Sequence, residues 1–242
     1  NNYMKYLYDR KITKSSISRK LSSIRGLYNY LVREDIIKEN HFNKIQNPKR
    51  ELYLPKFLKD EELDKIFSVC NSNNPTEERD TLIIELLYAT GVRVSELVNI
   101  KIKDIDFSER EIKIMGKGSK ERFVFYNKEC AIVLDSYLKE CRSKLLNGKD
   151  SEYLFINHLG DKLTDRGIRL IIDKIVKKSC IKSKVSPHTF RHTFATMLLN
   201  EGCNIKSVQE LLGHSSLGTT GIYTHLTNDE VRLAYMKAHP RA

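Results

Sequence analysis

The chain has no long apolar segment and no paired cysteines. In its 242 residues, no run approaches the roughly 18 apolar residues that a membrane-spanning helix needs, and nothing in it resembles a secretory signal peptide. The five cysteines are scattered without a Cys-x-x-Cys pair, which argues against disulfides and against a zinc site. We therefore expect a soluble protein of the reducing cytosol, with no membrane partner.

The sequence also lacks internal repeats, low-complexity blocks and an initial methionine. It starts at Asn1 and enters Tyr-Met-Lys-Tyr-Leu almost at once, which is typical of the last turns of a helix. We expect from this a chain that lacks an N-terminal portion. The length suffices for one large domain or two smaller ones, with a real hydrophobic core.

Positive charge is in excess and unevenly distributed. The formal net charge is +11, and residues 1–56 hold 13 Lys and Arg against 5 Asp and Glu. A solvated surface is the ordinary explanation of basic residues, but this concentration favours a polyanionic partner, most simply DNA. An anionic membrane is disfavoured because the basic segment has no aromatic-rich insertion face.

Hydrophobic periodicity predicts a mainly α chain with one small antiparallel β-sheet. Ile17, Leu21 and Ile24 begin an apolar face over 14–34, and two prolines with a loss of periodicity make 45–57 a linker. Alternating residues predict two strands joined by a glycine-bearing hairpin turn, at 111–115 and 122–126. Further helices are expected at about 60–70, 77–89, 94–98, 128–146, 164–179, 187–200, 205–212 and 227–238.

Glycines and capping residues mark several helix ends. Gly91 is placed as the left-handed residue that ends the helix over 77–89. Ser186 as N-cap and Pro187 at the first helical position begin the helix over 187–200. Asn204 and Gly213 bound the helix that follows.

Four polar side chains lie close together in the sequence near its C-terminal end. They are His188, Arg191, His214 and Tyr223, and the first two, three residues apart on a helix, project from one face. Two imidazoles, a guanidinium and a phenol suit a phosphodiester, with the phenol as the attacking nucleophile.

Two more cations stand far upstream in settings typical of active-site edges. Arg93 follows a helix-ending glycine, and Lys117 lies in the hairpin turn. Each of the six residues also has an ordinary structural explanation as a surface, turn or capping residue. His188 and His192 are spaced like two metal ligands, but no intervening Glu and no third ligand accompany them. The joint occurrence of the six favours phosphodiester chemistry.

These segments resemble the tyrosine recombinases of the phage integrase family, especially the bacterial Xer branch. The resemblance covers essentially the whole chain, and Gly218 and Gly221 replace residues that are more often Ser and a longer polar side chain. It rests on Ala89–Leu97, Gly116–Arg122, His188–Thr196, Leu211–Ser215, Tyr223–His225 and His239–Ala242.

The resemblance implies a tyrosine-recombinase catalytic domain preceded by part of a helical core-binding domain that clasps DNA. On this basis, residues 1–44 are the truncated C-terminal part of the core-binding domain, and 45–57 form the linker. Residues 58–242 are then the catalytic domain, with a C-terminal assembly helix.

The residue types fit the implied reaction. Two guanidiniums offer forked donors to the non-bridging oxygens, and two imidazoles add hydrogen bonds, with His188 able to accept the phenol proton. Lys117 suits the general acid that protonates the departing 5′-oxygen. A free tyrosine has a pKa near 10, so cations that favour phenolate are needed around Tyr223. Because the phosphotyrosine stores the bond energy, we expect no cofactor and no metal.

The partners expected are DNA and other recombinase subunits. The resemblance implies a homo- or hetero-tetramer on a double-stranded DNA recombination site, chromosome dimer resolution at cell division, and a septal DNA translocase that touches the C-terminal region. The alternatives are an integrase of a mobile element, a type IB topoisomerase and a non-catalytic DNA-binding module. Six cations are candidates for DNA contact, namely Lys14, Arg19, Lys20, Arg25, Lys120 and Arg122.

Overall fold

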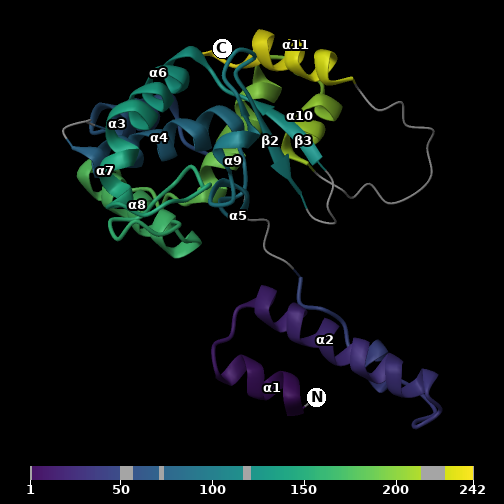
Figure 1. Ribbon diagram of the computed structural model, residues 1–242. Coiled ribbons are helices and arrows are strands. Elements are labelled where there is room, and N and C mark those ends of the chain that lie inside the picture. The colour runs from purple at the N-terminus through teal and green to yellow at the C-terminus, as the bar shows by residue number, and fades with distance from the viewer. Residues whose placement is uncertain (1, 50–56, 71–73, 117–120, 214–226, 242) are drawn as a thin grey trace. The chain divides into compact units, whose positions relative to one another are not determined.

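The chain divides into two compact units, Asn1–Leu54 and Pro55–Ala242. A computed structural model describes residues 2–49, 57–70, 74–116, 121–213 and 227–241 of the protein (Figure 1). The division falls within 45–57, the segment that the sequence predicts as a linker.

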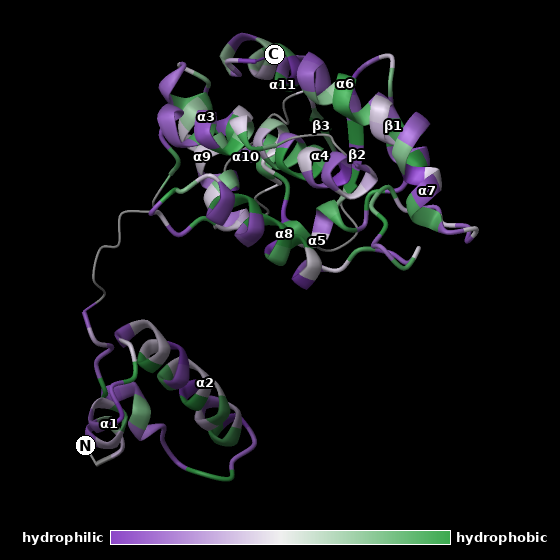
Figure 2. Ribbon diagram, turned by 90° about the vertical axis from the view of Figure 1, so that its left-hand side faces the viewer, coloured by the Kyte–Doolittle hydropathy of each residue, from purple (hydrophilic) through white to green (hydrophobic). Residues whose placement is uncertain are grey.

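The first unit is helical, with a small core. It comprises α1 (Asn2–Asp9), α2 (Lys14–Arg33) and the 3-10 turn η1 (His41–Lys44). Thr13 caps α2, since its hydroxyl accepts from the backbone N–H of Ser16 at 3.3 Å, which confirms the predicted helix start. The buried core consists of Leu7, Ile17 and Leu21. Hydrophobic and hydrophilic residues both occur along α2, as expected of an amphipathic helix (Figure 2).

The second unit holds the remaining helices and the sheet. Its elements in chain order are α3 (Asp60–Ser68), α4 (Pro75–Thr90), α5 (Val94–Leu97), η2 (Ile102–Asp104), β1 (Ile105–Asp106), β2 (Glu111–Met115), β3 (Glu121–Phe125), α6 (Lys128–Ser136), the π-helical turn η3 (Tyr137–Cys141), α7 (Arg142–Leu146), α8 (Asp165–Lys178), α9 (Pro187–Asn200), α10 (Ile205–Leu212) and α11 (Asn228–Ala238).

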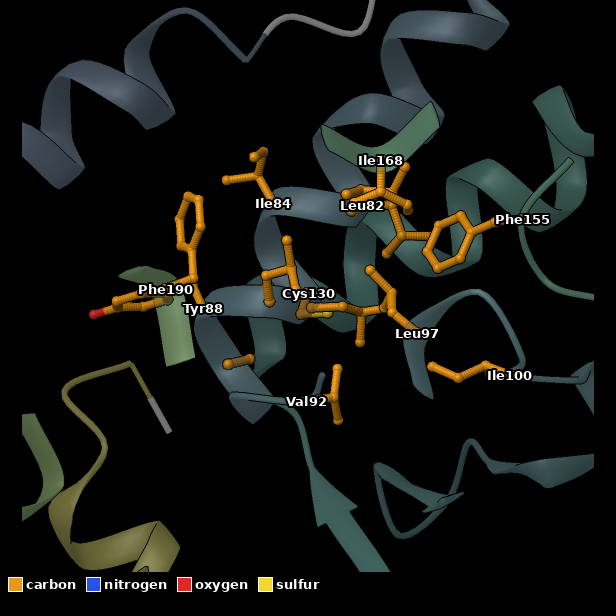
Figure 3. Packing of buried hydrophobic residues seen from close by; sticks show 14 of the residues in the cluster. Leu82, Ile84, Tyr88, Val92, Leu97, Ile100, Cys130, Phe155, Ile168 and Phe190 are labelled. Carbon is orange, nitrogen blue, oxygen red and sulfur yellow. The ribbon is translucent and has the colours of Figure 1, made fainter. Parts of the chain in front are cut away.

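Helix α4 forms the centre of this unit. It packs against α6, α7, α8 and α9, and its residues Leu82, Ile84 and Tyr88 belong to the main core (Figure 3). Every residue from 78 to 90 is buried, so α4 is covered on all sides instead of presenting one apolar stripe. The helix ends at Gly91, which adopts a left-handed φ of +59°, as the sequence predicts.

The sheet is antiparallel, with strand order β1-β2-β3. Ile112 pairs with Val124 between β2 and β3, and both are fully buried. A second apolar core joins β3 to α9, α10 and α11, and Phe125, Phe194 and Tyr235 are its aromatic members. The sheet and α10 therefore share one packed region, which positions the candidate site described below.

The predicted fold class is confirmed, with two differences of detail. Strand β1 is absent from the sequence prediction because a strand of two residues carries no alternating pattern. The predicted helix over 128–146 is interrupted by the π-helical turn, where the buried Tyr137 hydroxyl donates to the carbonyl of Leu154 at 3.1 Å. Among the described residues, no helix is long and apolar enough to cross a membrane.

Candidate active site

Arg93 occupies the short connection between α4 and α5. Its backbone N–H donates to Glu96 Oε2 at 2.8 Å, and its Nη1 donates to Glu96 Oε1 at 2.8 Å. A third bond runs from Nη2 to the carbonyl of Gly213 at 3.3 Å. The side chain is 37% exposed. The guanidinium is therefore hydrogen-bonded to the protein and also accessible to solvent.

Helix α9 carries His188 and Arg191 in successive turns. Ser186 caps the helix, since its hydroxyl accepts from the N–H of Thr189 at 3.3 Å, and Pro187 takes the first position. The predicted cap is confirmed. His188 is exposed in the first turn, whereas Arg191 is only 9% exposed.

The Arg191 guanidinium is a partly desolvated cation. Nη1 donates to the carbonyl of Gly91 at 2.8 Å, and Nη2 donates to the carbonyl of Leu212 at 2.6 Å. Burial lowers the pKa of Arg191 to about 10, and the nearby Arg93 cation adds to the decrease. The group is still charged at neutral pH, and an anionic ligand would compensate for the desolvation.

Arg122 on β3 lies in the same cluster. Its Nη1 and Nη2 donate to the two carboxylate oxygens of Glu96 at 3.0 and 2.8 Å, and its Nε donates to the carbonyl of Leu211 at 3.0 Å. The side chain is 12% exposed. Arg122 is predicted from the sequence to contact DNA, but in the structure its guanidinium has partners within the chain.

Glu96 is the residue of this cluster that the sequence analysis misses. Its carboxylate accepts from both Arg93 and Arg122. Burial alone would raise the pKa of Glu96, but hydrogen bonding and charge from Arg122, followed by hydrogen bonds from Arg93, lower it below its ordinary value. A signal exists in the sequence, because a Glu at the third helical position is typical of a side chain that accepts from the N–H of the residue before the helix.

The C-terminal end of α10 is held by three different arginines. Three successive backbone carbonyls accept hydrogen bonds from them. The carbonyl of Leu211 accepts from Arg122, that of Leu212 from Arg191, and that of Gly213 from Arg93. Carbonyls at a helix C-terminus lack intrahelical donors and carry partial negative charge. Gly213 ends α10 with a left-handed φ of +63°, as the sequence predicts, and His214 follows it directly in the chain.

Two of the six predicted catalytic residues, Arg93 and Arg191, are thus brought together at one helix end. The structure places His188 one turn from Arg191 on α9. The other three predicted catalytic residues, Lys117, His214 and Tyr223, lie outside the described residues. The predicted DNA contact Lys120 also lies outside them.

The remaining DNA-contact candidates lie on α2. Lys14, Arg19 and Lys20 are exposed. Arg25 differs from them, because its Nε donates to the carbonyl of Phe42 at 3.0 Å and its Nη2 donates to the carbonyl of Ile45. The Arg25 guanidinium therefore ties α2 to the segment around η1. Within the described parts of the chain, no group of three or more His, Cys, Asp or Glu side chains could hold a metal ion.

Comparisons with known proteins match almost the entire chain. The model of the phage integrase family matches residues 56–230. Tyrosine recombinase XerC of Oceanobacillus iheyensis is 48% identical over 242 residues, which cover 99% of this chain and 79% of the relative. Tyrosine recombinase XerC of Staphylococcus epidermidis is 44% identical over 241 residues, with 100% of this chain and 81% of the relative covered.

Solved structures share the fold. The crystal structure of XerA recombinase matches with a TM-score of 0.62 and 29% identity, over 99% of this chain and 90% of that chain. The Tn1549 transposon integrase in complex with transposon right end DNA has a TM-score of 0.75 at 22% identity, over 98% of this chain and 83% of that chain. This second likeness concerns the fold alone.

Proposed function

Because this chain belongs to the phage integrase family and is a tyrosine site-specific recombinase, we propose that it cuts and rejoins double-stranded DNA with Tyr223 as nucleophile. The phenol oxygen attacks the phosphorus, the bond to the 5′-oxygen breaks, and a 3′-phosphotyrosine forms. In rejoining, a 5′-hydroxyl attacks the phosphotyrosine and releases the phenol. The observation that supports the site is the convergence of Arg93 and Arg191 on the end of α10, one residue before His214.

The two arginines are suited to hold the phosphate. Within the described residues, Arg191 donates to two carbonyls, and a guanidinium has five N–H groups, so donors remain for phosphate oxygens. Arg93 is partly exposed beside it. Fixed guanidiniums aimed at the non-bridging oxygens stabilise the charge that develops there in the transition state.

The proton transfers require a base and an acid. We assign acceptance of the phenol proton to His188, which is exposed one turn before Arg191. Protonation of the departing 5′-oxygen is assigned to Lys117, and a further hydrogen bond to the phosphate is assigned to His214. Rejoining uses the same groups in reversed roles.

The biological role is proposed from the Xer branch. It comprises chromosome dimer resolution in the cytoplasm, by a homo- or hetero-tetramer on the recombination site, with a septal DNA translocase as regulator. Helix α11 buries Val231 and Tyr235 in its own unit and leaves Leu233 and Met236 exposed. The exposed pair supplies an apolar surface for a neighbouring subunit. Integration of a mobile element is the alternative, because it uses the same chemistry.

The decisive experiment is capture of the covalent intermediate. A nicked suicide duplex that carries candidate sites from the replication-terminus region of the source genome should form a protein–DNA adduct with the wild-type chain. Tyr223→Phe should abolish the adduct and leave the affinity for the intact duplex unchanged, since only the nucleophilic oxygen is removed. Denaturing gels measure the adduct, and gel shifts measure binding. An adduct that persists in Tyr223→Phe contradicts the assignment.

A further inference from the structure

Arg122 joins three parts of the catalytic unit that are distant in the sequence. It lies on β3, its carboxylate partner Glu96 lies on α5, and its carbonyl partner Leu211 lies on α10. The paired bonds to Glu96 form a two-pronged contact, which fixes both the distance and the plane of the two groups. Few side chains could replace it, because only arginine offers this rigid fork together with an Nε donor.

Close packing reinforces these bonds. A Cβ placed on Gly213 would lie 3.0 Å from both Cδ and Nη1 of Arg122, so the arginine side chain lies directly over the glycine. The left-handed φ of Gly213 is needed to end α10 here, and the absent side chain provides the space that Arg122 occupies. The arrangement therefore depends on both residues.

We propose that Arg122 is a positioning residue for the reaction: by holding the Glu96 carboxylate against the end of α10, it sets the orientation of the Arg93 guanidinium. Arg93 reaches the same carboxylate through both its backbone and its side chain. The Gly213 carbonyl that accepts from Arg93 belongs to the peptide group that leads to His214. Arg122 thereby aligns the phosphate-binding arginine with the start of the segment that carries the predicted nucleophile.

A direct contact of Arg122 with DNA is the competing explanation. Its Nη1 and Nη2 both donate to the Glu96 carboxylate, which compensates the charge of Arg122, and its Nε donates to the Leu211 carbonyl. Among the described residues, Arg191 instead donates to neutral carbonyls, so no hydrogen-bonded carboxylate compensates its charge there. The Arg93 side chain is more exposed than that of Arg122, at 37% against 12%. The geometry therefore favours an action of Arg122 through Glu96.

The positioning role of Arg122 predicts that its loss changes the pH dependence of DNA cleavage. Among the described residues, the charged groups that face Glu96 are Arg93 at the start of α5, Arg122 from β3 and Arg191 from α9. Without Arg122, burial would still raise the pKa of Glu96, while its main opposing partner would be gone. Protonated Glu96 then loses its charge-assisted bonds to Arg93, so cleavage should fail at a higher pH than in the wild type.

The test compares Arg122→Met with the wild type on the suicide duplex. We expect cleavage to slow on the order of 10-fold to 100-fold, and the acid limb of the pH–rate profile to move to higher pH. The affinity for intact duplex and its salt dependence should not change. A direct phosphate contact would instead reduce the slope of log K against log salt by about one, which would overturn the positioning role.

Arg142→Met is the matched control. Arg142 is a buried arginine whose guanidinium donates to the carbonyls of Ser151, Tyr153 and Leu154, and none of these acceptors belongs to the candidate site. Its loss should lower thermal stability without moving the acid limb. Equal effects of the two substitutions on rate and pH profile would reduce Arg122 to an ordinary structural residue.

A second pair of substitutions keeps the test decisive. If Arg122→Met does not fold, Arg122→Lys is combined with Glu96→Gln. The lysine substitution should slow cleavage no further once the carboxylate is gone, and additive losses would contradict the proposal.

The inference rests on the proposed function, and different results would contradict each of them. A wild-type chain that forms no adduct contradicts the function, whereas an adduct formed equally fast by Arg122→Met overturns only the role of Arg122.

Discussion

At the scale of single residues, two glycines fix the ends of the helices that surround the candidate site. Gly91 and Gly213 both have left-handed φ angles, and the carbonyl of each accepts a hydrogen bond from an arginine. A residue with a side chain would be strained at either position. The glycines therefore allow the backbone to turn sharply and let the arginines approach its carbonyl groups.

Gly91→Ala is expected to destabilise the protein far more than Gly202→Ala. Both positions have positive φ, which costs about 1 kcal/mol for alanine. A Cβ at Gly91 would lie 2.5 Å from Cδ1 of the buried Phe194, whereas nothing lies within 4 Å at Gly202. Overpacking should add about 1–3 kcal/mol at Gly91. Urea unfolding of both variants measures the difference, and equal losses would show that Phe194 moves away freely.

The residues of the candidate site differ in how far the sequence alone could predict them. The helices that hold Arg93 and Arg191 could be predicted, because glycine or a cap marks their ends; the catalytic roles of the two arginines stay predictions. The position of Glu96 at the start of α5 is a local signal, but its pairing with Arg122, and the bond from Arg122 to the Leu211 carbonyl, join residues far apart in the chain. Side-chain spacing along the sequence carries no information about such through-space pairs.

At the scale of elements, α2 holds its basic residues in two different environments. Arg19 and Lys20 are exposed on the helix, whereas Arg25 holds the segment around η1. The sequence predicts α2 correctly because its apolar periodicity is a local signal. It groups Arg25 with the other cations because the acceptors of Arg25 lie 17 to 22 residues further along the chain.

Lys20→Gln and Arg25→Gln should therefore behave differently. Loss of a phosphate contact at Lys20 should reduce the slope of log K against log salt by about 0.9 and leave the helix content unchanged. Arg25→Gln should lower the unfolding temperature of the first unit, since the part-buried carbonyls of Phe42 and Ile45 lose a charged donor. Salt titrations of DNA binding and circular dichroism melts separate the two. An unchanged salt slope in Lys20→Gln would remove it from the DNA contacts.

At the scale of the whole chain, the C-terminal residues return to the core of the catalytic unit. His239 is 4% exposed and packs against the rings of Tyr88, Phe194 and Tyr235. Arg241 adds an ion pair to Glu85 at 3.2 Å and lies over the Phe67 ring. The last described residues thus connect to α3, α4 and α9, a packing that the apolar periodicity of α11 alone does not predict.

Acid should weaken this attachment through His239. Burial lowers the pKa of His239 from 6.5 to about 4, so the unfolded chain binds a proton that the folded chain excludes. Stability is complete above the unfolded pKa and falls as pH drops from about 6.5 to about 4, by up to about 3 kcal/mol. His239→Phe keeps an aromatic ring in the same surroundings and cannot titrate, so its stability should change less over this range. Urea unfolding at a series of pH values measures both chains. Parallel curves would show that other groups cause the acid sensitivity, whereas curves that converge at high pH and separate at low pH would assign it to His239.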